Sequence, residues 1–499
     1  MTLTEPMTTT AQDLNDFLAA LAPHQALRIG GVRRASSNQA TFSLTDPSTG
    51  TEICAVASAT PEDAVAAVDA AQRAFLPWSQ LAPRKRSDVL RRAYELIVER
   101  VELLAKLISW ENGKSLADAR GEVLYSAEFF RWYAEEAVRS EGSYGESPAG
   151  GTRTIVTHKP VGVAALVTPW NFPAAMAARK LAPALAAGCT TVLKPASETP
   201  LTALAIADIL EEAGAIAGTV NVVPSRRSAE IAETLLSDPR VQKISFTGST
   251  GVGSTLLAQA ARRIVNTSME LGGNAPFIVT DDADIDAAVE GALIAKLRNG
   301  GQACTAANRF YVHAAVANEF TEKIGARIEA LRVGDPLNES TDIGPLINDR
   351  AVKTITALID GALAGGAKIT HQAQIPETGA GSYLAPTVLT DVPADSALVT
   401  SEIFGPVTPV VTWREDSEVL AMANASEFGL AAYVYSQDLK RALKIAEGLD
   451  SGMVGINRGL ISDPAAPFGG FKQSGIGREG AREGIREYLE TQYFSVDWS

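Results

Sequence analysis

The sequence predicts an α/β protein with doubly wound, mostly parallel sheets. Short apolar runs alternate along the chain with runs of helical periodicity, which is the order of βαβ units. One such series begins near residue 161, and a second begins at the apolar run 275–279 and continues to about residue 470. Because 499 residues exceed what one hydrophobic core usually serves, we expect more than one domain.

Each predicted element rests on a local pattern. Thr60 and Asp63 have the spacing of a reciprocal helix cap, and Pro61 suits the first helical position, so a mostly helical region is expected from residue 60 to 137. The predicted strands of the first series are 161–167, 190–193, 220–223 and 243–246. The helices predicted between them include 201–213 and 228–236. Parallel sheets of this kind bind ligands beyond the carboxyl ends of their strands.

Composition and charge narrow the class of protein. Lys and Arg number 44 and Asp and Glu 58, which gives a net charge of −14 and argues against non-specific binding to nucleic acid or to anionic membranes. The most apolar stretch, 161–193, is interrupted by prolines and by Arg179 and Lys180, so it does not read as a membrane span. The N-terminus lacks a basic and then apolar leader pattern, and we expect a cytoplasmic protein.

Cysteine and histidine usage predicts neither a disulfide framework nor a metal site. The chain has three cysteines and four histidines, and none has metal-ligand spacing: Cys54, Cys189, Cys304, His24, His158, His313 and His371. Reduced thiols are therefore expected.

Cys304 is the most informative residue. Asp284 begins an amphipathic helical run, which Gly300 and Gly301 end, so Cys304 is expected in a turn beyond a helix. A lone thiol in such a turn is either a nucleophile or a small buried hydrophobic residue, and position alone leaves both open. The glycine-rich segment 248–253 follows a predicted strand and is either a phosphate-binding turn or an ordinary tight turn.

Several segments, in order along the chain, resemble the aldehyde dehydrogenase superfamily. They are Pro169–Pro173, Lys194–Ser197, Phe246–Ser249, Met269–Gly273, Gly300–Arg309, Glu402–Pro406 and Pro467–Ser474. The resemblance covers about residue 45 to the C-terminus. Within the superfamily it is closest to the enzymes that oxidise succinate semialdehyde, chiefly through segments 272–279, 296–299 and 459–462.

The resemblance implies three structural parts. Residues 1–138 and 160–271 correspond to a doubly wound, Rossmann-like cofactor-binding domain, and residues 272–472 to a second α/β domain that is catalytic. Residues 139–159 and 486–499 correspond to a small β arm through which subunits associate, so a homodimer or homotetramer is expected. The alternative is a C-terminal tail that folds on its own domain.

The resemblance also implies catalytic roles. Cys304 corresponds to the nucleophile that attacks the aldehyde carbon, and Asn171 to the donor that, with the Cys304 N–H, stabilises the oxyanion. Glu270 corresponds to the general base that activates water to hydrolyse the thioester, as in members that do not acylate coenzyme A. Its apolar neighbours Met269 and Leu271 favour a raised pKa. The alternatives are a turn asparagine and a solvated glutamate.

A nicotinamide cofactor is implied as well. Residues that match cofactor contacts of the family are Lys194 at the adenosine ribose, Trp170, Gly248 and Ser249 near the adenosine and pyrophosphate, and Glu402 and Phe404 at the nicotinamide ribose. Ser197 stands where a carboxylate would repel a 2′-phosphate, so NADP is preferred over NAD, which stays possible. Arg226 is expected to meet the same phosphate unless it is a solvated surface residue.

Arg179, Arg298 and Ser462 match positions that bind the distal carboxylate of the substrate in the enzymes most resembled. Two guanidinium groups and a hydroxyl form a suitable set of donors for a carboxylate, although either arginine could instead form a structural ion pair. The implied reaction is oxidation of succinate semialdehyde to succinate with NADP. The alternatives are glutarate semialdehyde, an uncharged aldehyde, or a catalytically silent relative.

Overall fold

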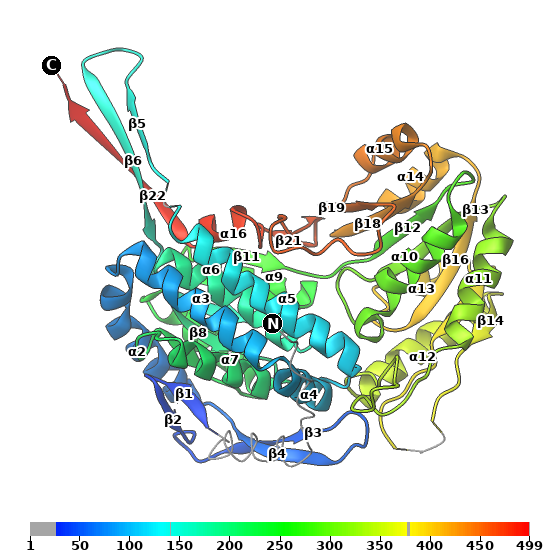
Figure 1. Cartoon of the computed structure of the whole chain (residues 1–499), viewed down its shortest axis with the longest axis horizontal. Coiled ribbons are helices and arrows are strands. Elements are labelled where there is room, and N and C mark those ends of the chain that lie inside the picture. Colours follow the sequence, from blue (N-terminus) through cyan, green and yellow to red (C-terminus); the bar gives the residue numbers. More distant parts are fainter. Residues whose placement is uncertain (1–25, 140, 377–379, 499) are drawn as a thin grey trace, which may run out of the picture.

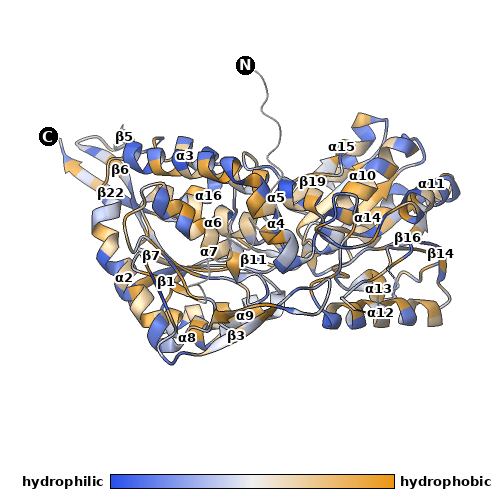
Figure 2. Cartoon of the chain, turned by 60° about the horizontal axis from the view of Figure 1, so that its bottom comes forward, coloured by the Kyte–Doolittle hydropathy of each residue, from blue (hydrophilic) through white to orange (hydrophobic). Residues whose placement is uncertain are grey.

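The computed structural model describes residues 26–139, 141–376 and 380–498. Two lobes, each with a large sheet flanked by helices, lie side by side, and a narrow sheet projects from one lobe (Figure 1). In the described part of the chain, no helix has the length and apolar character needed to cross a membrane. Apolar residues face inward and polar residues cover the outer faces of the helices (Figure 2).

The first lobe contains an eight-stranded sheet with the order β2-β1-β9-β8-β7-β10-β11-β21. The bounds are β1 (Leu27–Ile29), β2 (Val32–Arg34), β7 (Val163–Val167), β8 (Thr190–Lys194), β9 (Val220–Val222), β10 (Val241–Thr247), β11 (Asn266–Glu270) and β21 (Gly475–Ile476). The strands from β9 to β11 are parallel. Their order is that of a doubly wound sheet, in which the direction of winding reverses between β7 and β10.

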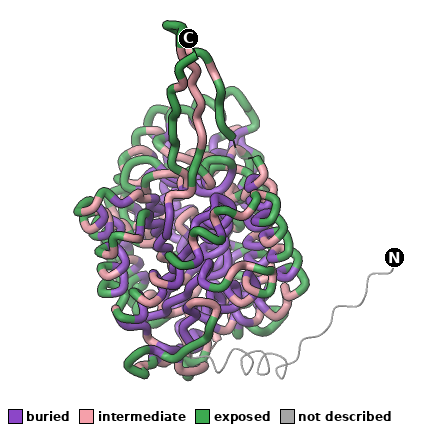
Figure 3. Tube along the Cα trace, turned by 90° about the vertical axis from the view of Figure 1, so that its left-hand side faces the viewer, coloured by how far each residue is buried: buried purple, intermediate pink, exposed green. Residues whose placement is uncertain are grey.

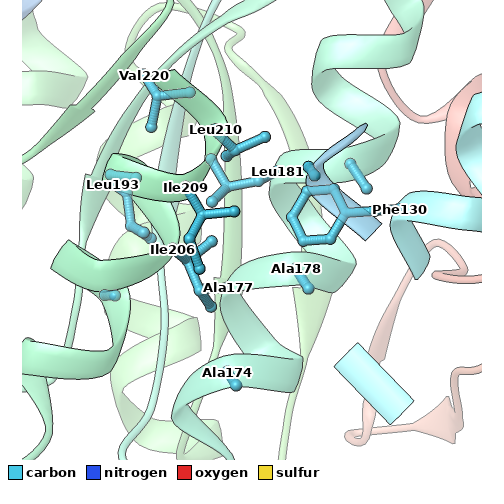
Figure 4. Close-up of a cluster of buried hydrophobic side chains, with 14 of the residues drawn as sticks. Phe130, Ala174, Ala177, Ala178, Leu181, Leu193, Ile206, Ile209, Leu210 and Val220 are labelled. Atoms are coloured by element: carbon cyan, nitrogen blue, oxygen red, sulfur yellow. The ribbon is translucent and has the colours of Figure 1, made fainter. Parts of the chain in front are cut away.

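Helices cover both faces of this sheet. On one face lie α2 (Pro61–Ser79), α8 (Ser228–Ser237) and α9 (Thr250–Ala261). On the other lie α3 (Pro83–Glu99), α4 (Val101–Asn112), α5 (Leu116–Glu136), α6 (Pro173–Ala187) and α7 (Pro200–Glu212). Small residues of α6 allow close packing: Ala178 lies next to Phe130 of α5, and Ala177 lies next to Ile206 of α7 (Figure 4).

The second lobe contains a seven-stranded sheet with the order β14-β15-β16-β13-β12-β18-β19, parallel except for the edge strand β14. The bounds are β12 (Ala275–Val279), β13 (Ala307–His313), β14 (Lys368–Gln372), β15 (Thr387–Thr390), β16 (Val407–Trp413), β18 (Ala431–Tyr435) and β19 (Met453–Ile456). One face carries α10 (Ile285–Leu297) and α11 (Ala317–Glu329). The other carries α12 (Asp349–Ala364), α13 (Ala397–Thr400), α14 (Asp416–Asn424) and α15 (Leu439–Glu447).

The projecting sheet is antiparallel and consists of β5 (Ser143–Glu146), β6 (Thr152–Pro160) and β22 (Leu489–Asp497). Most of it is exposed (Figure 3). Smaller elements are the hairpin β3 (Thr41–Thr45) with β4 (Glu52–Ala57), the pair β17 (Phe428–Gly429) with β20 (Phe471–Lys472), and α16 (Glu483–Arg486). The division into three parts stays a prediction, which the two separate sheets and this arm support.

The doubly wound α/β prediction is confirmed. Thr60 and Asp63 form the predicted reciprocal cap, and the helical region to residue 137 consists of α2 to α5. The first central strand begins at Val163 rather than at residue 161, because the Val161 N–H is bonded to the carbonyl of Tyr488 at the base of the arm. His24 lies outside the described residues.

Candidate active site

A cavity of about 270 Å³ lies beyond the carboxyl ends of β7 and β10, where the winding of the first sheet reverses. Its lining comes from segments 169–172, 247–249 and 271–272, together with Met176, Cys304, Glu402 and Phe404. Both lobes therefore contribute to it. This is the position at which doubly wound sheets bind ligands.

Cys304 is presented by a tight turn between α10 and β13. Asp284 caps α10, and the helix ends at Leu297. The following Asn299, Gly300 and Gly301 all have left-handed φ values of 54°, 59° and 78°. At Gly301 a Cβ atom would lie 2.3 Å from the carbonyl oxygen of Gly405, so only glycine fits there. The turn leaves Cys304 half-buried at the cavity wall.

Asn171 lies between β7 and α6 and is buried. Its Nδ2 donates to the carbonyl of Gln302 at 3.0 Å. The backbone carbonyl of Asn171 accepts hydrogen bonds of 2.7 Å from Lys114 Nζ and from Asn299 Nδ2. Asn171 and the turn before Cys304 are thus tied together through both backbone and side chain.

Glu270 is the last residue of β11 and is 3% exposed. Within the described residues its Oε2 has no hydrogen-bond partner. Burial raises the pKa of this carboxyl well above its usual value, and the nearby Glu479 raises it further. Arg179 and Lys180 oppose that rise. Because only the ionised carboxylate accepts a proton, the raised pKa moves this ability of Glu270 to higher pH.

Burial also raises the pKa of the Cys304 thiol, to about 12. Arg179 lowers this pKa, whereas Glu402 and Glu270 raise it. The thiol is thus protonated at neutral pH in the absence of ligands, and the thiolate needs a positive or hydrogen-bonding partner to form.

Glu402 and Phe404, predicted at the nicotinamide ribose, line the cavity together with Trp170, which was predicted near the adenosine and pyrophosphate. Trp170 and Phe404 pack edge to face with their ring centroids 5.5 Å apart, and Phe404 has an uncommon φ of 56°. Glu402 accepts a hydrogen bond of 3.1 Å from the Gly273 N–H, and burial raises its pKa to about 7. The left-handed backbone of Phe404 is strained, and strain of this kind is often found at ligand contacts.

Gly248 and Ser249 lie at the start of α9. At Gly248 a Cβ atom would lie 2.5 Å from the Phe246 ring. Ser249 occupies the N-cap position, yet its side chain makes no capping hydrogen bond. The N–H groups of the first turn therefore lack a side-chain acceptor, which suits an approaching anion.

The residues predicted at the adenosine end lie apart from the cavity wall. Lys194, at the end of β8, is 4% exposed and donates to Ser228 Oγ at 2.6 Å, and burial lowers its pKa to about 8. Ser197 is half-buried and donates to Glu198 at 3.1 Å. Arg226 is exposed, donates to the carbonyl of Ser43 at 2.9 Å and lies over the Phe42 ring.

Of the predicted substrate residues, Arg179 is held in an ion pair. Its side chain is 1% exposed, and its Nε lies 2.8 Å from Glu479 Oε2, at an angle that departs from a hydrogen bond. Its guanidinium also lies 3.9 Å from the centroid of the Phe468 ring. Arg179 therefore forms the structural pair that was one of its two expected states, close enough to Cys304 to lower the thiol pKa.

Arg298 differs from Arg179. Its guanidinium lies over the rings of Phe172 and Tyr125, at 4.8 and 5.5 Å, and among the described residues it has no ion-pair partner within 4.0 Å. Ser462 is half-buried in the loop between β19 and β20. None of the three predicted substrate residues lines the 270 Å³ cavity. Arg298 instead lines another pocket, together with Asp118 and Arg327.

The sequence interpretation missed Glu479 and Lys180. Lys180 Nζ lies 2.5 Å from Glu479 Oε1 and 2.9 Å from Ser245 Oγ, and all three residues are buried. The signal was present, because two adjacent basic residues in an apolar helix need a carboxylate partner. No His, Cys, Asp or Glu cluster that could hold a metal occurs in the described part of the chain.

The model of the aldehyde dehydrogenase family matches residues 34–494. The chain therefore belongs to the aldehyde dehydrogenase family.

Named relatives are similar over most of their length. The chain is 54% identical to a succinate-semialdehyde dehydrogenase of Paenarthrobacter nicotinovorans, over 89% of this chain and 98% of the relative. It is 46% identical to the succinate-semialdehyde dehydrogenase [NADP(+)] of Escherichia coli, over 97% and 99%. It is also 46% identical to a glutarate-semialdehyde dehydrogenase of Pseudomonas putida, over 95% and 98%.

The fold also matches solved structures. A crystal structure described as an E. coli NADP-dependent enzyme superimposes with a TM-score of 0.93 at 45% identity, covering 95% of this chain and 98% of that one. The predicted aldehyde dehydrogenase fold is thereby confirmed.

The close approach of Gly273 to the nucleophile turn yields a test. A Cβ atom at Gly273 would lie 2.2 Å from the Cys304 carbonyl oxygen, so Gly273→Ala must displace that turn. We expect kcat to fall about 10- to 100-fold because the sulfur is misplaced. Steady-state kinetics on folded protein measures this. Gly361→Ala in α12, where a Cβ meets nothing within 4 Å, is the matched control and should retain full activity. Unchanged kcat in Gly273→Ala would show that the turn tolerates displacement.

Proposed function

We propose that this chain oxidises succinate semialdehyde to succinate with NADP⁺, through a thioester on Cys304 that water hydrolyses. The observation that carries this proposal is the grouping of a half-buried Cys304 and the amide of Asn171 on one cavity, with the buried Glu270 near enough to act on the thiol pKa. The succinate-semialdehyde relatives support the same substrate.

In this proposal the Cys304 thiolate attacks the aldehyde carbon, and the carbonyl oxygen takes the negative charge. Asn171 Nδ2–H and the Cys304 backbone N–H are the proposed donors to that oxyanion. The positive charge of Arg179 favours the thiolate. After oxidation, Glu270 accepts a proton from the water that attacks the thioester. The C–S bond breaks, the thiolate stays on Cys304, and succinate leaves with one oxygen of its new carboxylate from that water.

Bound NADP⁺ supplies the acceptor for the hydride that leaves the former aldehyde carbon. The residues fit such a cofactor: the uncapped start of α9 suits the pyrophosphate, and the Trp170–Phe404 wall with Glu402 suits the nicotinamide ribose. The Lys194 ammonium is buried without a carboxylate within 4.0 Å among the described residues, so it can meet a phosphate. Ser197 leaves room for that phosphate, and Arg226 is the second proposed cation.

Arg298 is the proposed main contact of the substrate carboxylate, with Arg179 and Ser462 as further contacts. Its guanidinium is unpaired and lies over Phe172, next to Asn171. Glutarate semialdehyde is the second candidate, since a glutarate-semialdehyde dehydrogenase is 46% identical to the chain, as is the E. coli succinate-semialdehyde dehydrogenase. Because the three cysteines are unpaired thiols, we place the activity in the reducing cytoplasm.

Parallel assays test both substrate and cofactor. We expect kcat/KM to be highest with succinate semialdehyde and NADP⁺, and at least about tenfold lower with the uncharged butanal, since an unpaired guanidinium is left without its carboxylate. Formation of reduced cofactor is followed with succinate semialdehyde, glutarate semialdehyde and butanal, each with NADP⁺ or NAD⁺. Nearly equal kcat/KM with the two cofactors would overturn the NADP preference.

Arg298→Ala belongs to the same assay. It should raise the KM for succinate semialdehyde and leave the KM for butanal almost unchanged. An unchanged KM for succinate semialdehyde would remove Arg298 from the substrate site.

The role of Glu270 is tested by Glu270→Gln. The variant should form about one equivalent of reduced cofactor per site and then slow by about 100- to 10,000-fold, with an acyl adduct on Cys304 visible by mass spectrometry. In the unmodified enzyme the steady rate should fall as the pH drops through the raised pKa of Glu270, because only the ionised carboxylate accepts a proton. That dependence should vanish in Glu270→Gln. Cys304→Ala should lack even the first turnover, and a Glu270→Gln enzyme with normal steady rates would exclude this base.

We also propose that the arm joins subunits into a homodimer or homotetramer. Tyr144, Tyr493, Phe494 and Trp498 on the arm are 42–63% exposed in the single chain. The double variant Tyr493→Asp with Phe494→Asp should have a smaller mass than the unmodified protein in light scattering after gel filtration. Ile264→Asp, at a 93% exposed position on the body, is the control and should keep the mass. Equal masses for all three proteins would place association elsewhere.

A further inference from the structure

One short stretch of chain, from Asn112 at the end of α4 to Glu122 in α5, contacts both the turn that carries Asn171 and the turn that precedes Cys304. Its contacts with the Asn171 turn are Asn112 Nδ2 to the Trp170 carbonyl at 2.9 Å, Lys114 Nζ to the Asn171 carbonyl at 2.7 Å, and Glu122 Oε1 from the Ala174 and Ala175 N–H groups at 2.8 and 3.2 Å. Asp118 Oδ2 accepts from the Asn299 N–H at 2.7 Å, in the turn before Cys304.

Lys114 and Glu122 are the centre of this stretch. Their side chains are 0% exposed, and Lys114 Nζ lies 2.5 Å from Glu122 Oε2. Lys114 Nζ is also 4.0 Å from the centroid of the Phe172 ring. Burial lowers the pKa of Lys114, and the charge of Glu122 opposes this. A buried ion pair costs desolvation energy and often adds no net stability. We therefore look for its role in the backbone groups that the two side chains bind.

Each member of the pair holds one side of the same turn. Lys114 fixes the carbonyl of Asn171, while Glu122 binds the first free N–H groups of α6, directly after the turn. These contacts hold the backbone from which the Asn171 side chain projects. Its amide then lies over Gln302, in the turn that presents Cys304.

We propose that Lys114 and Glu122 are positioning residues that set the place of the Asn171 amide relative to Cys304. The inference rests on the proposed function, in which Asn171 binds the oxyanion. Neither residue lines the cavity, so they act through Asn171 rather than on the substrate. A displacement of about 1 Å at such a donor is enough to cost about 100-fold in rate.

Glu111 offers a matched comparison. It is also buried, and it caps α7 by accepting from the Leu201 and Thr202 N–H groups, both at 2.9 Å. Among the described residues it has no lysine partner within 4.0 Å, and its hydrogen bonds go to residues 201 and 202 rather than to residues 170–172. Glu111→Gln therefore disturbs a buried helix cap without disturbing the Asn171 turn.

The experiment is a double-mutant cycle on the full-length enzyme. The variants are Lys114→Met, Asn171→Ala and the two combined, with kcat, KM and thermal unfolding measured for each. Asn171→Ala should lower kcat about 100- to 1,000-fold. Lys114→Met should lower kcat about 10- to 100-fold with little change in the KM for succinate semialdehyde. Added to Asn171→Ala, it should lower kcat less than about twofold, because the donor it positions is gone.

Folding is controlled by two further variants. Lys114→Met with Glu122→Gln removes both charges, so it should regain thermal stability lost by Lys114→Met but not its kcat. Glu111→Gln should lower the unfolding temperature with kcat retained.

The outcomes separate the two proposals. If Lys114→Met lowers kcat equally with and without Asn171, or if the neutral pair restores kcat, the positioning role is wrong while the proposed function stands. If Asn171→Ala itself leaves kcat unchanged, the proposed oxyanion site is wrong.

Discussion

The site depends on hydrogen bonds between two turns that belong to different sheets. The Asn171 turn follows β7 of the first sheet, and the Asn299–Cys304 turn precedes β13 of the second. Asn171 donates to Gln302 and accepts from Asn299, so each turn fixes the other. Since sulfur and amide reach the cavity from separate lobes, any sliding of the lobes would change the distance between them. These bonds therefore hold the two lobes in the relative position that sets the distance between the Cys304 sulfur and the Asn171 amide.

Burial of charge is the second constraint. The same exclusion of water that raises the pKa values of Cys304 and Glu270 makes the fields of Arg179 and Glu479 strong at the site. Glu479 compensates both Arg179 and Lys180, which would otherwise be two uncompensated cations inside an apolar helix. Glu270 thus lies beside a cluster of one carboxylate, Glu479, and two cations, and small movements of one charge shift the proton affinity of the others.

Local patterns predicted the central strands well and the long-range partners poorly. The strand 275–279 was predicted with its observed bounds because a parallel strand buried on both faces reads as one apolar run. Strand β11, Asn266–Glu270, was not predicted, because its polar residues hide the apolar run that marks a buried strand. Those polar residues are there because the buried Lys243 of β10 bonds Asn266 and Ser268. Cys304, Asn171 and Glu270 were predicted as site residues through ordered motifs, and their roles stay predictions. Glu479, which lies 299 positions from Lys180, follows no spacing that a sequence displays.

In the proposed function, the groups that bind the substrate carboxylate and the oxyanion both lie close to Phe172. Arg298 and Lys114 both lie over the ring of Phe172, the residue after Asn171. Arg179 is already paired with Glu479, so in this arrangement the unpaired charge available to a distal carboxylate is that of Arg298. In the proposed function, a carboxylate at Arg298 and an oxyanion at Asn171 would then be held by two turns that hydrogen bonds tie together. We therefore expect selection of aldehydes by length, because Arg298 and Asn171 cannot move apart to admit a longer substrate.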